Sequence, residues 1–389
     1  MKSIKRTLLS LAICFAVTAP CLAQQSADEL LDEIEAAHAE QLDRFQRLRD
    51  ILKDLPMPDP EPDPDPVPRD GIWISPAEVA ALPDGPLWEN VKDYAERPAS
   101  PNVSNQNELS NVITMAKALA YVRTGDDRYR EEVIELCDEV IGTEDDAGND
   151  SRTLSLGRKL CAYIIAADLV GLPDDVDSRF KFWLLAVRDR ELKGKTLIST
   201  HEGRPNNWGT SAGASRLAIA LYLGEQAEVE RCAQVFKGWL GDRSSYAGFK
   251  YGELSWQADP DRPVGVNPKG SMKNGRNIDG VLPDDQRRGG RFRWPPPKEN
   301  YIYTALQGVV AQAIMLDRAG YDVWEWEDQA IKRAFVWMHD IADYRAEDAG
   351  GDDVHMLPVI ESVYGLDYWD GSPCEHGKIV GFTGWTHGD

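Results

Sequence analysis

Two consecutive amides, Asn206 and Asn207, stand where a polar turn leads directly into an apolar helix that we expect over residues 210–223. A turn at such a junction holds its side chains and aims them across a cavity, and we expect Thr210 or Ser211 to cap the helix behind them. Each amide can donate and accept hydrogen bonds, so the pair suits the binding of a polar ligand. Both asparagines are therefore the first candidates for a functional site.

A second group of reactive side chains lies in a long interruption of the helical pattern, residues 241–300. Residues 286–298 contain five cations and no acid, although the whole chain has a net charge of −22. Loops of this length in a compact domain are commonly functional, and cations beside Trp suit an anionic ligand whose rings can stack. The alternative is a solvated loop whose charges face water. The candidate contact residues are Trp256, Arg287, Arg288, Arg291, Arg293 and Trp294.

The elements that must position these groups are almost all helices. Ser75 followed by Pro76 is typical of a helix start, and long helical patterns joined by short polar turns predict antiparallel hairpins. Hairpins arranged around one cavity form an α/α toroid, so we expect an all-α domain over residues 71–389. A helical bundle or solenoid is the alternative, and the lack of a fixed-period repeat disfavours a solenoid. The expected helices cover 108–123, 128–141, 153–170, 176–191, 210–223, 225–240, 302–319 and 325–344.

The segments before this domain indicate export and a spacer. Residues 1–23 have the cationic start, apolar core and small-residue end of a signal peptide, so we expect a periplasmic or secreted protein. No later apolar stretch is long enough to span a membrane. Residues 24–55 form a charged helical pattern with a weak heptad stripe that would allow self-association. Residues 56–70 alternate Pro with acids, which predicts an extended linker.

Composition excludes several classes of function. An acidic chain lacks the basic footprint of a nucleic-acid-binding protein. Cys137, Cys161 and Cys232 lie within helical patterns, which favours buried free thiols, and two disulfides that also involve Cys374 are the alternative. No cysteine pair has zinc-site spacing. The histidines of the C-terminal tail, His376 and His387, match no strong metal motif with Glu375 and Asp389, so we expect neither a metal nor a cofactor.

Three motifs occur in the order Asn206-Asn207-Trp208-Gly209, Asp279–Arg288 and Tyr301-Ile-Tyr-Thr-Ala-Leu306. Together with the flanking segments 117–126 and 152–158, this order resembles the alginate-lyase type polysaccharide lyases of the chondroitin AC/alginate lyase superfamily. The resemblance covers about residues 72–340. It implies an incomplete α/α toroid with a cleft for an anionic uronate polysaccharide, which is cleaved by β-elimination.

The resemblance also implies roles for single residues. In the family's Asn-Asn-His motif, the amide binds the substrate carboxylate and the histidine lies beside it. An Arg-rich turn neutralises charge, and a tyrosine before Ala-Leu moves the proton. These roles fall on Asn207, on Arg291 or Arg293, and on Tyr301. The histidine position holds Trp208, which cannot accept a proton.

His201 is the histidine nearest to the motif and could supply the missing imidazole, as a base or as a partner of the carboxylate. The alternative is a loop histidine that bonds to the backbone, and Arg204 leaves the same two options. Tyr301 could act alone on mannuronate or glucuronate, where the proton and the leaving oxygen lie on the same face. Tyrosine titrates near ~10, so the cationic loop would have to favour its ionised form.

Two other classes of function remain as alternatives. An inverting glycoside hydrolase would use two carboxylates, for example Glu253 with Asp284 or Asp285. The richness of the loop in Arg and Asn disfavours that reading. The third hypothesis is a non-catalytic carbohydrate-binding module, in which loss of the motif histidine marks loss of activity.

Overall fold

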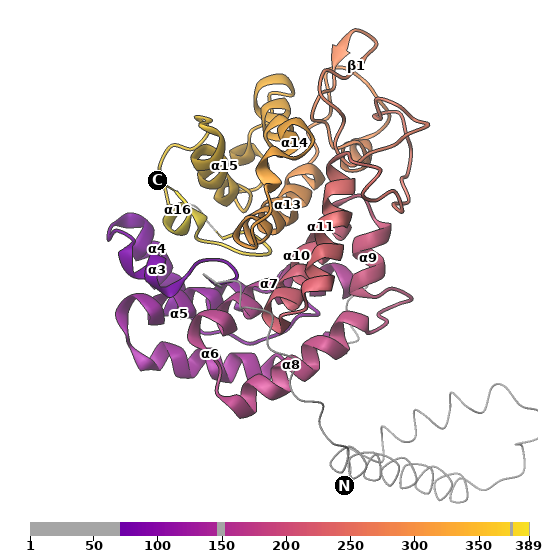
Figure 1. The fold of residues 1–389 in the computed structure, drawn as a ribbon. Helices are drawn as coiled ribbons and strands as arrows, with labels where there is room; N and C mark the ends of the chain where they lie inside the picture. The colour runs from indigo at the N-terminus through magenta and orange to yellow at the C-terminus, as the bar shows by residue number, and fades with distance from the viewer. Residues whose placement is uncertain (1–70, 146–151, 374–375, 389) are drawn as a thin grey trace, which may run out of the picture. The chain divides into compact units, whose positions relative to one another are not determined.

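The computed structural model describes residues 71–145, 152–373 and 376–388 (Figure 1). Contact clustering divides the chain into two units, residues 1–68 and residues 69–389. The signal peptide, charged helix and linker predicted for residues 1–70 lie outside the described residues. Cys374, Glu375 and Asp389 also lie outside them.

Helices form most of the described chain, so the predicted all-α fold is confirmed, whereas the toroid remains a prediction. Two short strands, β1 (Met272–Lys273) and β2 (Arg276–Asn277), form an antiparallel hairpin. They lie inside the long interruption of residues 241–300, which we call the basic loop. The helices are α3 Pro76–Ala81, α4 Pro86–Ala95, α5 Ser110–Thr124, α6 Asp127–Glu139, α7 Arg152–Val170, α8 Asp174–Asp189, α9 Leu197–Gly203, α10 Asn207–Leu223, α11 Gln226–Leu240, α12 Pro283–Gln286, α13 Tyr301–Arg318, α14 Trp326–Val336, α15 Leu357–Tyr364 and α16 Thr383–Thr386.

Helices α5, α7, α10 and α13 form an inner layer, and α6, α8, α11 and α14 lie outside it. Ser215 of α10 donates to Gly157 O of α7 at 2.8 Å and accepts from Cys161 N at 3.1 Å. Gln312 of α13 donates to Thr210 O of α10 at 3.1 Å. A Cβ atom on Gly157 of α7 would meet Ala212 of α10, and one turn further on in both helices Cys161 bonds to Ser215. Likewise, a Cβ atom on Gly308 of α13 would meet Thr210, and one on Gly213 would meet Gln312. The contacts of each pair advance in the same sense, so the three helices are parallel. Their N-terminal ends therefore lie at one end of the domain.

Two glycines let the inner helices approach closely. A Cβ atom on Gly157 would lie 2.8 Å from Ala212 N, and a Cβ atom on Gly308 would lie 2.5 Å from Thr210 C. Both distances are shorter than ordinary van der Waals contact, and backbone cannot yield as a flexible side chain can. The close crossings fix the first turns of α10 and α13 relative to each other.

Replacing Gly308 with alanine is expected to lower the free energy of unfolding by about 1–3 kcal/mol because the added methyl group overpacks the crossing. The intrinsic helix preference of alanine acts in the opposite direction. The matched control is Gly203→Ala in α9, where nothing lies within 4 Å of the added Cβ. Denaturant unfolding measures both variants, and equal stabilities would contradict this account of the crossing.

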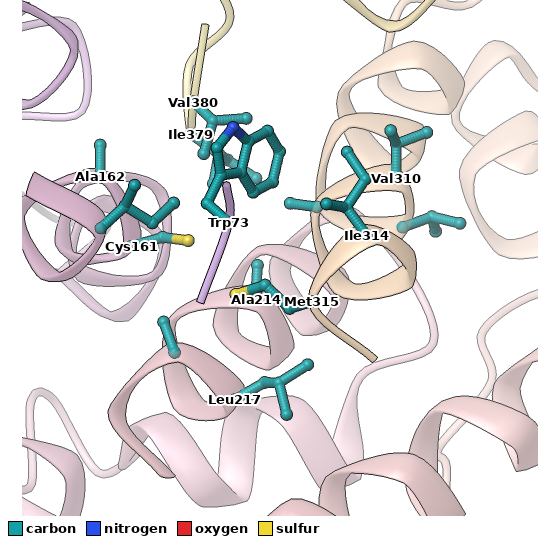
Figure 2. Close-up of a cluster of buried hydrophobic side chains, with 14 of the residues drawn as sticks. Trp73, Cys161, Ala162, Ala214, Leu217, Val310, Ile314, Met315, Ile379 and Val380 are labelled. Carbon is teal, nitrogen blue, oxygen red and sulfur yellow. The ribbon is translucent and has the colours of Figure 1, made fainter. Parts of the chain in front are cut away.

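Trp73 fills the centre of the inner layer (Figure 2). Its side chain is 1% exposed and lies among residues of α7, α10 and α13, including Cys161, Ala214 and Ile314. Ile379 of the C-terminal tail covers the same cluster. At this level the space between the inner helices is hydrophobic core, because the N-terminal and C-terminal segments of the domain both insert into it.

The cysteines in the described residues confirm the prediction of free thiols. Cys137, Cys161 and Cys232 are buried and form no disulfide among the residues that the structure describes. Burial raises the pKa of Cys161 and of Cys232 to about 12. A thiol with so high a pKa is a structural side chain, since the thiolate is the reactive form.

Candidate functional site

Helix α10 begins earlier than predicted. Asn206 is its N-cap, with an extended backbone and a side-chain oxygen that accepts from Trp208 N at 3.2 Å. The cap predicted at Thr210 or Ser211 is therefore wrong, because asparagine is itself a preferred N-cap and ends the turn four residues earlier. The correction places Asn207 in the first turn of the helix.

Asn207 is fully buried, yet its side-chain amide has no hydrogen-bond partner among the described residues. Buried amides are nearly always paired, and leaving one unpaired costs about 1–3 kcal/mol. A residue kept at that cost is a candidate for contact with a ligand or a water molecule. Asn207 lies in the first turn of α10, where the helix dipole also favours an anion.

Asp284 and Asp285 of α12 fasten the basic loop to these asparagines, and we call this pair the acid clasp. Asn206 Nδ2 donates to Asp284 Oδ2 at 2.9 Å, and Asn207 N donates to Asp285 Oδ1 at 3.1 Å. Both carboxylates are buried. Burial, with Asp284 beside it, raises the pKa of Asp285 well above its usual range.

The acid clasp argues against the hydrolase alternative. Asp284 also accepts from Gly252 N at 2.8 Å and from Arg287 Nε at 2.7 Å, so its lone pairs are used within the protein. Glu253 accepts from Ser255 at 2.9 and 2.7 Å. An inverting hydrolase needs two carboxylates that face each other across a sugar and a water molecule. The described contacts instead give Glu253 and Asp284 structural roles.

Asp284→Ala is expected to lower the free energy of unfolding by about 3 kcal/mol because it leaves Asn206, Gly252 and Arg287 without their shared acceptor. Thermal or denaturant unfolding measures this loss. Glu253→Ala in the same loop is the control, since Glu253 is less buried and mainly binds its neighbour Ser255. A smaller loss of stability for Asp284→Ala than for the control would contradict the stabilising role of the acid clasp.

Tyr301 is the first residue of α13 and is 37% exposed. It lies at the same end of the inner layer as Asn207, because α10 and α13 are parallel. The guanidinium carbon of Arg288 lies 4.0 Å from the centre of its ring. The ring of Tyr301 therefore lies against a cation of the loop.

The other arginines of the loop take different positions. Arg287 pairs with Asp284, whereas Arg291 is exposed and lies 3.9 Å from Glu253. Arg293 is exposed as well. The loop arginine that stacks on Tyr301 is therefore Arg288. Among the described residues, Arg291 and Arg293, the predicted catalytic cations, make no cation–ring contact with it.

The aromatic candidates divide into core and surface residues. Trp256 is fully buried, and its indole donates to Gly290 O at 2.9 Å, so the expected stacking role of Trp256 is wrong. It packs instead against Phe292. Trp208 and Trp294 are half-buried, and each lies beside an arginine: Arg204 at 4.4 Å and Arg276 at 5.3 Å from the ring centres.

His201 lies in α9, behind the first turns of α10. Its side chain is buried, and its Nδ1 is 3.4 Å from Arg216 Nη1. Burial and then the charge of Arg216 lower the pKa of His201 well below its usual range. It lines a small cavity with Thr210 and Gln312. Within the described part of the chain, no hydrogen bond joins His201 to Asn207 or Tyr301.

Arg158 is a candidate that sequence reasoning did not select. It is 6% exposed, its Nη1 donates to Gln106 Oε1 at 3.2 Å, and its Nε has no partner among the described residues. Burial lowers the pKa of Arg158 to about 10. The sequence did contain a signal for Arg158, because it is a cation within an apolar helical pattern. It also directly follows Gly157, where α7 crosses α10 closely.

The raised pKa of Asp353, a residue near Arg158, can be tested through the pH dependence of stability. Burial, with Asp352 beside it, raises the pKa of Asp353 from 3.8 to about 6. The folded state therefore binds this proton more tightly than the unfolded state, so the carboxyl lowers stability as pH rises from about 4 to about 6. In Asp353→Asn, unfolding measured across this window should show that the stability of the variant relative to the wild type increases with pH. A difference that is constant with pH would contradict the assignment.

The structure shows no metal centre at this site: among the described residues, no three His, Cys, Asp or Glu side chains are grouped to hold an ion. His355 and His376 each have a ring nitrogen within hydrogen-bonding distance of a backbone oxygen, of Asp352 and of Gly377. His387 packs edge-on against Trp73, and His339 stacks on Tyr368. No described helix is long and apolar enough to cross a membrane.

Comparison with family models matches residues 81–255 to the model described as alginate lyase. A search of curated proteins finds no match. The matched region contains α4 to α11 and the Asn206–Asn207 junction. It ends before the acid clasp and before Tyr301.

Proposed function

Because the chain belongs to the alginate-lyase type of polysaccharide lyases, we propose that it cleaves a uronate polymer of the poly-mannuronate or glucuronan type by β-elimination. Tyr301 transfers the proton, and Asn207 and Arg288 neutralise the substrate carboxylate. One observation carries the proposal. The half-exposed Tyr301 lies beneath Arg288, at the end of the inner layer where the buried amide of Asn207 has no partner.

The reaction follows from these positions. The phenolate of Tyr301 takes the proton from C5 of the uronate, and the electron pair forms the C4–C5 double bond as the C4–O4 bond breaks. The resulting phenol then donates its proton to O4 of the leaving sugar. Negative charge grows on the carboxylate during the first step, so an amide donor and a guanidinium placed there stabilise the transition state more than the ground state.

If a single tyrosine acts as both base and acid, the reaction does not need the histidine of the family's motif. Trp208 cannot accept a proton, and the imidazole of His201 is buried against Arg216. On mannuronate and glucuronate one group on one face can act as base and then as acid. Arg288 supplies positive charge beside the ring of Tyr301.

Export is the second part of the proposal. Residues 1–23 serve as a signal peptide that is cleaved after Ala23, and the mature protein acts in the periplasm or outside the cell. N-terminal sequencing of the protein recovered from the producing cells tests this, since an intact Met1 would contradict it. The charged segment 24–55 is the candidate for self-association, which light scattering of the mature chain would reveal.

Incubation with a panel of uronate polymers tests the activity. Elimination leaves a conjugated double bond, so ultraviolet absorbance should rise together with reducing ends. Reducing ends without absorbance would indicate hydrolysis instead. Binding without either product would indicate the non-catalytic carbohydrate-binding module.

A further inference from the structure

Arg158 of α7 is a buried cation without a carboxylate partner, and we propose that it binds a second carboxylate of the uronate chain, on the unit next to the one that is cleaved. The inference rests on the proposed function and adds a second binding position to it. Its basis is a comparison of the buried lysines and arginines in the described part of the chain, which are Lys117, Arg158, Lys159 and Arg216.

The other three buried bases are paired or can lose their charge. Arg216 of α10 pairs with two glutamates, at 2.9 and 2.7 Å. Lys117 of α5 pairs with Glu132. Lys159 bonds to a backbone carbonyl and an amide oxygen, and burial lowers its pKa to about 7, so it can give up its proton near neutral pH. All three obey the rule that a buried charge is paired or neutralised.

Arg158 does neither. Its side chain is 6% exposed, and although burial lowers its pKa to about 10, it keeps its charge at neutral pH. Its Nη1 donates to the neutral amide of Gln106 at 3.2 Å, whereas its Nε has no partner. Among the described residues, Nη2 has no hydrogen-bond acceptor either. The edge formed by Nε and Nη2 is therefore free, and this edge can bind a carboxylate through two parallel hydrogen bonds.

Two acids lie near Arg158 without pairing with it. Asp352 and Asp353 favour its charge, against the larger effect of burial on its pKa. Asp352 pairs with Lys378, and Asp353 Oδ1 accepts from Gln307 at 2.6 Å. No carboxylate within the described part of the chain forms an ion pair with the guanidinium. An anion that binds the free edge must therefore come from a ligand.

Arg158 lies at the same end of the inner layer as the proposed site. It directly follows Gly157, where an added Cβ atom would lie 3.0 Å from Ser211 C. Ser211 lies one turn after Asn207 on α10, and its buried hydroxyl also has no partner. Because side chains lean toward the N-terminus of their helix, Arg158 extends toward the end of the domain at which α10 and α13 begin.

The helix order indicates which sugar unit Arg158 reaches. Tyr301 comes from α13, Asn207 from α10 and Arg158 from α7, and α10 packs against both of the other helices. The axes of packed helices lie about 8–10 Å apart. Asn207 and Arg288 bind the carboxylate of the cleaved unit in the proposed reaction, so Arg158 is left for the next unit on the α7 side. A uronate polymer has a carboxylate on every unit and can supply both.

Arg158→Gln should raise KM for poly-mannuronate by roughly 10–100-fold, the usual value of a hydrogen bond to a charged group. We expect kcat to change little, because a carboxylate away from the reacting unit is bound equally in the ground state and the transition state. Arg158→Lys should fall between the two, since an ammonium group cannot form the two parallel bonds. An unchanged KM would overturn the proposal.

A substrate with fewer carboxylates tests the contact itself. In poly-mannuronate with half of its carboxylates reduced to alcohols, kcat/KM of the wild type should fall by a larger factor than that of Arg158→Gln, because the variant has no cation to leave unpaired. The control is Arg179→Gln on the surface of α8, which makes the same change in net charge and should show the loss of the wild type. Equal factors for wild type and Arg158→Gln would overturn the proposal.

Stability distinguishes binding from a structural role. Arg158→Gln breaks no ion pair, so its unfolding midpoint should be unchanged or raised. Arg216→Gln leaves two glutamates without their partner and should lower the midpoint. Equal decreases for the two variants would show that Arg158 is structural. If the wild type forms no unsaturated product from any uronate polymer, the proposed function fails and this inference with it, whereas cleavage with an unchanged KM in Arg158→Gln refutes this inference alone.

Discussion

Tyr301→Phe is expected to lower kcat by about 10²–10⁴-fold, the usual contribution of a positioned acid or base. The ring can keep its place beneath Arg288, since only the hydroxyl is removed. Stability should change little because the side chain is half-exposed. Initial rates of absorbance increase on poly-mannuronate, together with an unfolding curve, measure both quantities.

Tyr303→Phe is the matched control on the same helix. The hydroxyl of Tyr303 donates to Tyr344 O at 2.5 Å and is buried, so its removal should cost about 1 kcal/mol of stability without loss of turnover. The opposite pattern, in which Tyr303→Phe is inactive and Tyr301→Phe retains its kcat, would exclude Tyr301 as the proton-transfer group.

Asn207→Ala has the second largest expected effect, a decrease in kcat of about 10²–10³-fold, which is typical for the loss of one donor at a developing anion. The side-chain amide of Asn207 forms no hydrogen bond with the described residues, so truncation to alanine breaks none and leaves the backbone bond to Asp285 in place. We therefore expect activity to fall far more than stability. Steady-state kinetics and denaturant unfolding of one preparation measure the two changes.

The neighbouring residue provides the contrast for this prediction. Asn206→Ala removes the N-cap of α10 and the bond to Asp284, so stability should fall by about 1–2 kcal/mol. Its effect on kcat should be smaller than that of Asn207→Ala. If Asn206→Ala instead decreased kcat more, the assignment of the two amides would have to be reversed.

Long helices were predictable from the sequence because their apolar period extends over many turns. The helix expected over 153–170 is α7, Arg152–Val170, and that expected over 225–240 is α11, Gln226–Leu240. Short helices were missed, among them α4, α9 and α15. Helices of that length are marginal alone and depend on tertiary packing, which a local pattern does not contain.

Two residues of the candidate site were predictable because each lies at the start of a long helix. Asn207 and Tyr301 each begin an inner helix, and the parallel packing of these helices places both at one end of the domain. The acid clasp was not predictable, because it joins residues 78 positions apart. The loop has no periodicity either, so the sequence could not distinguish Arg288 from Arg291 or reveal that Trp256 is buried.

The central claim is that the glycosidic bond breaks by elimination, and digestion of poly-mannuronate in heavy-oxygen water tests it most directly. Mass spectrometry of the products should show unsaturated ends that have lost the elements of water and have gained no heavy oxygen during bond cleavage. Saturated products that carry one heavy oxygen for each bond broken would show hydrolysis and contradict the account.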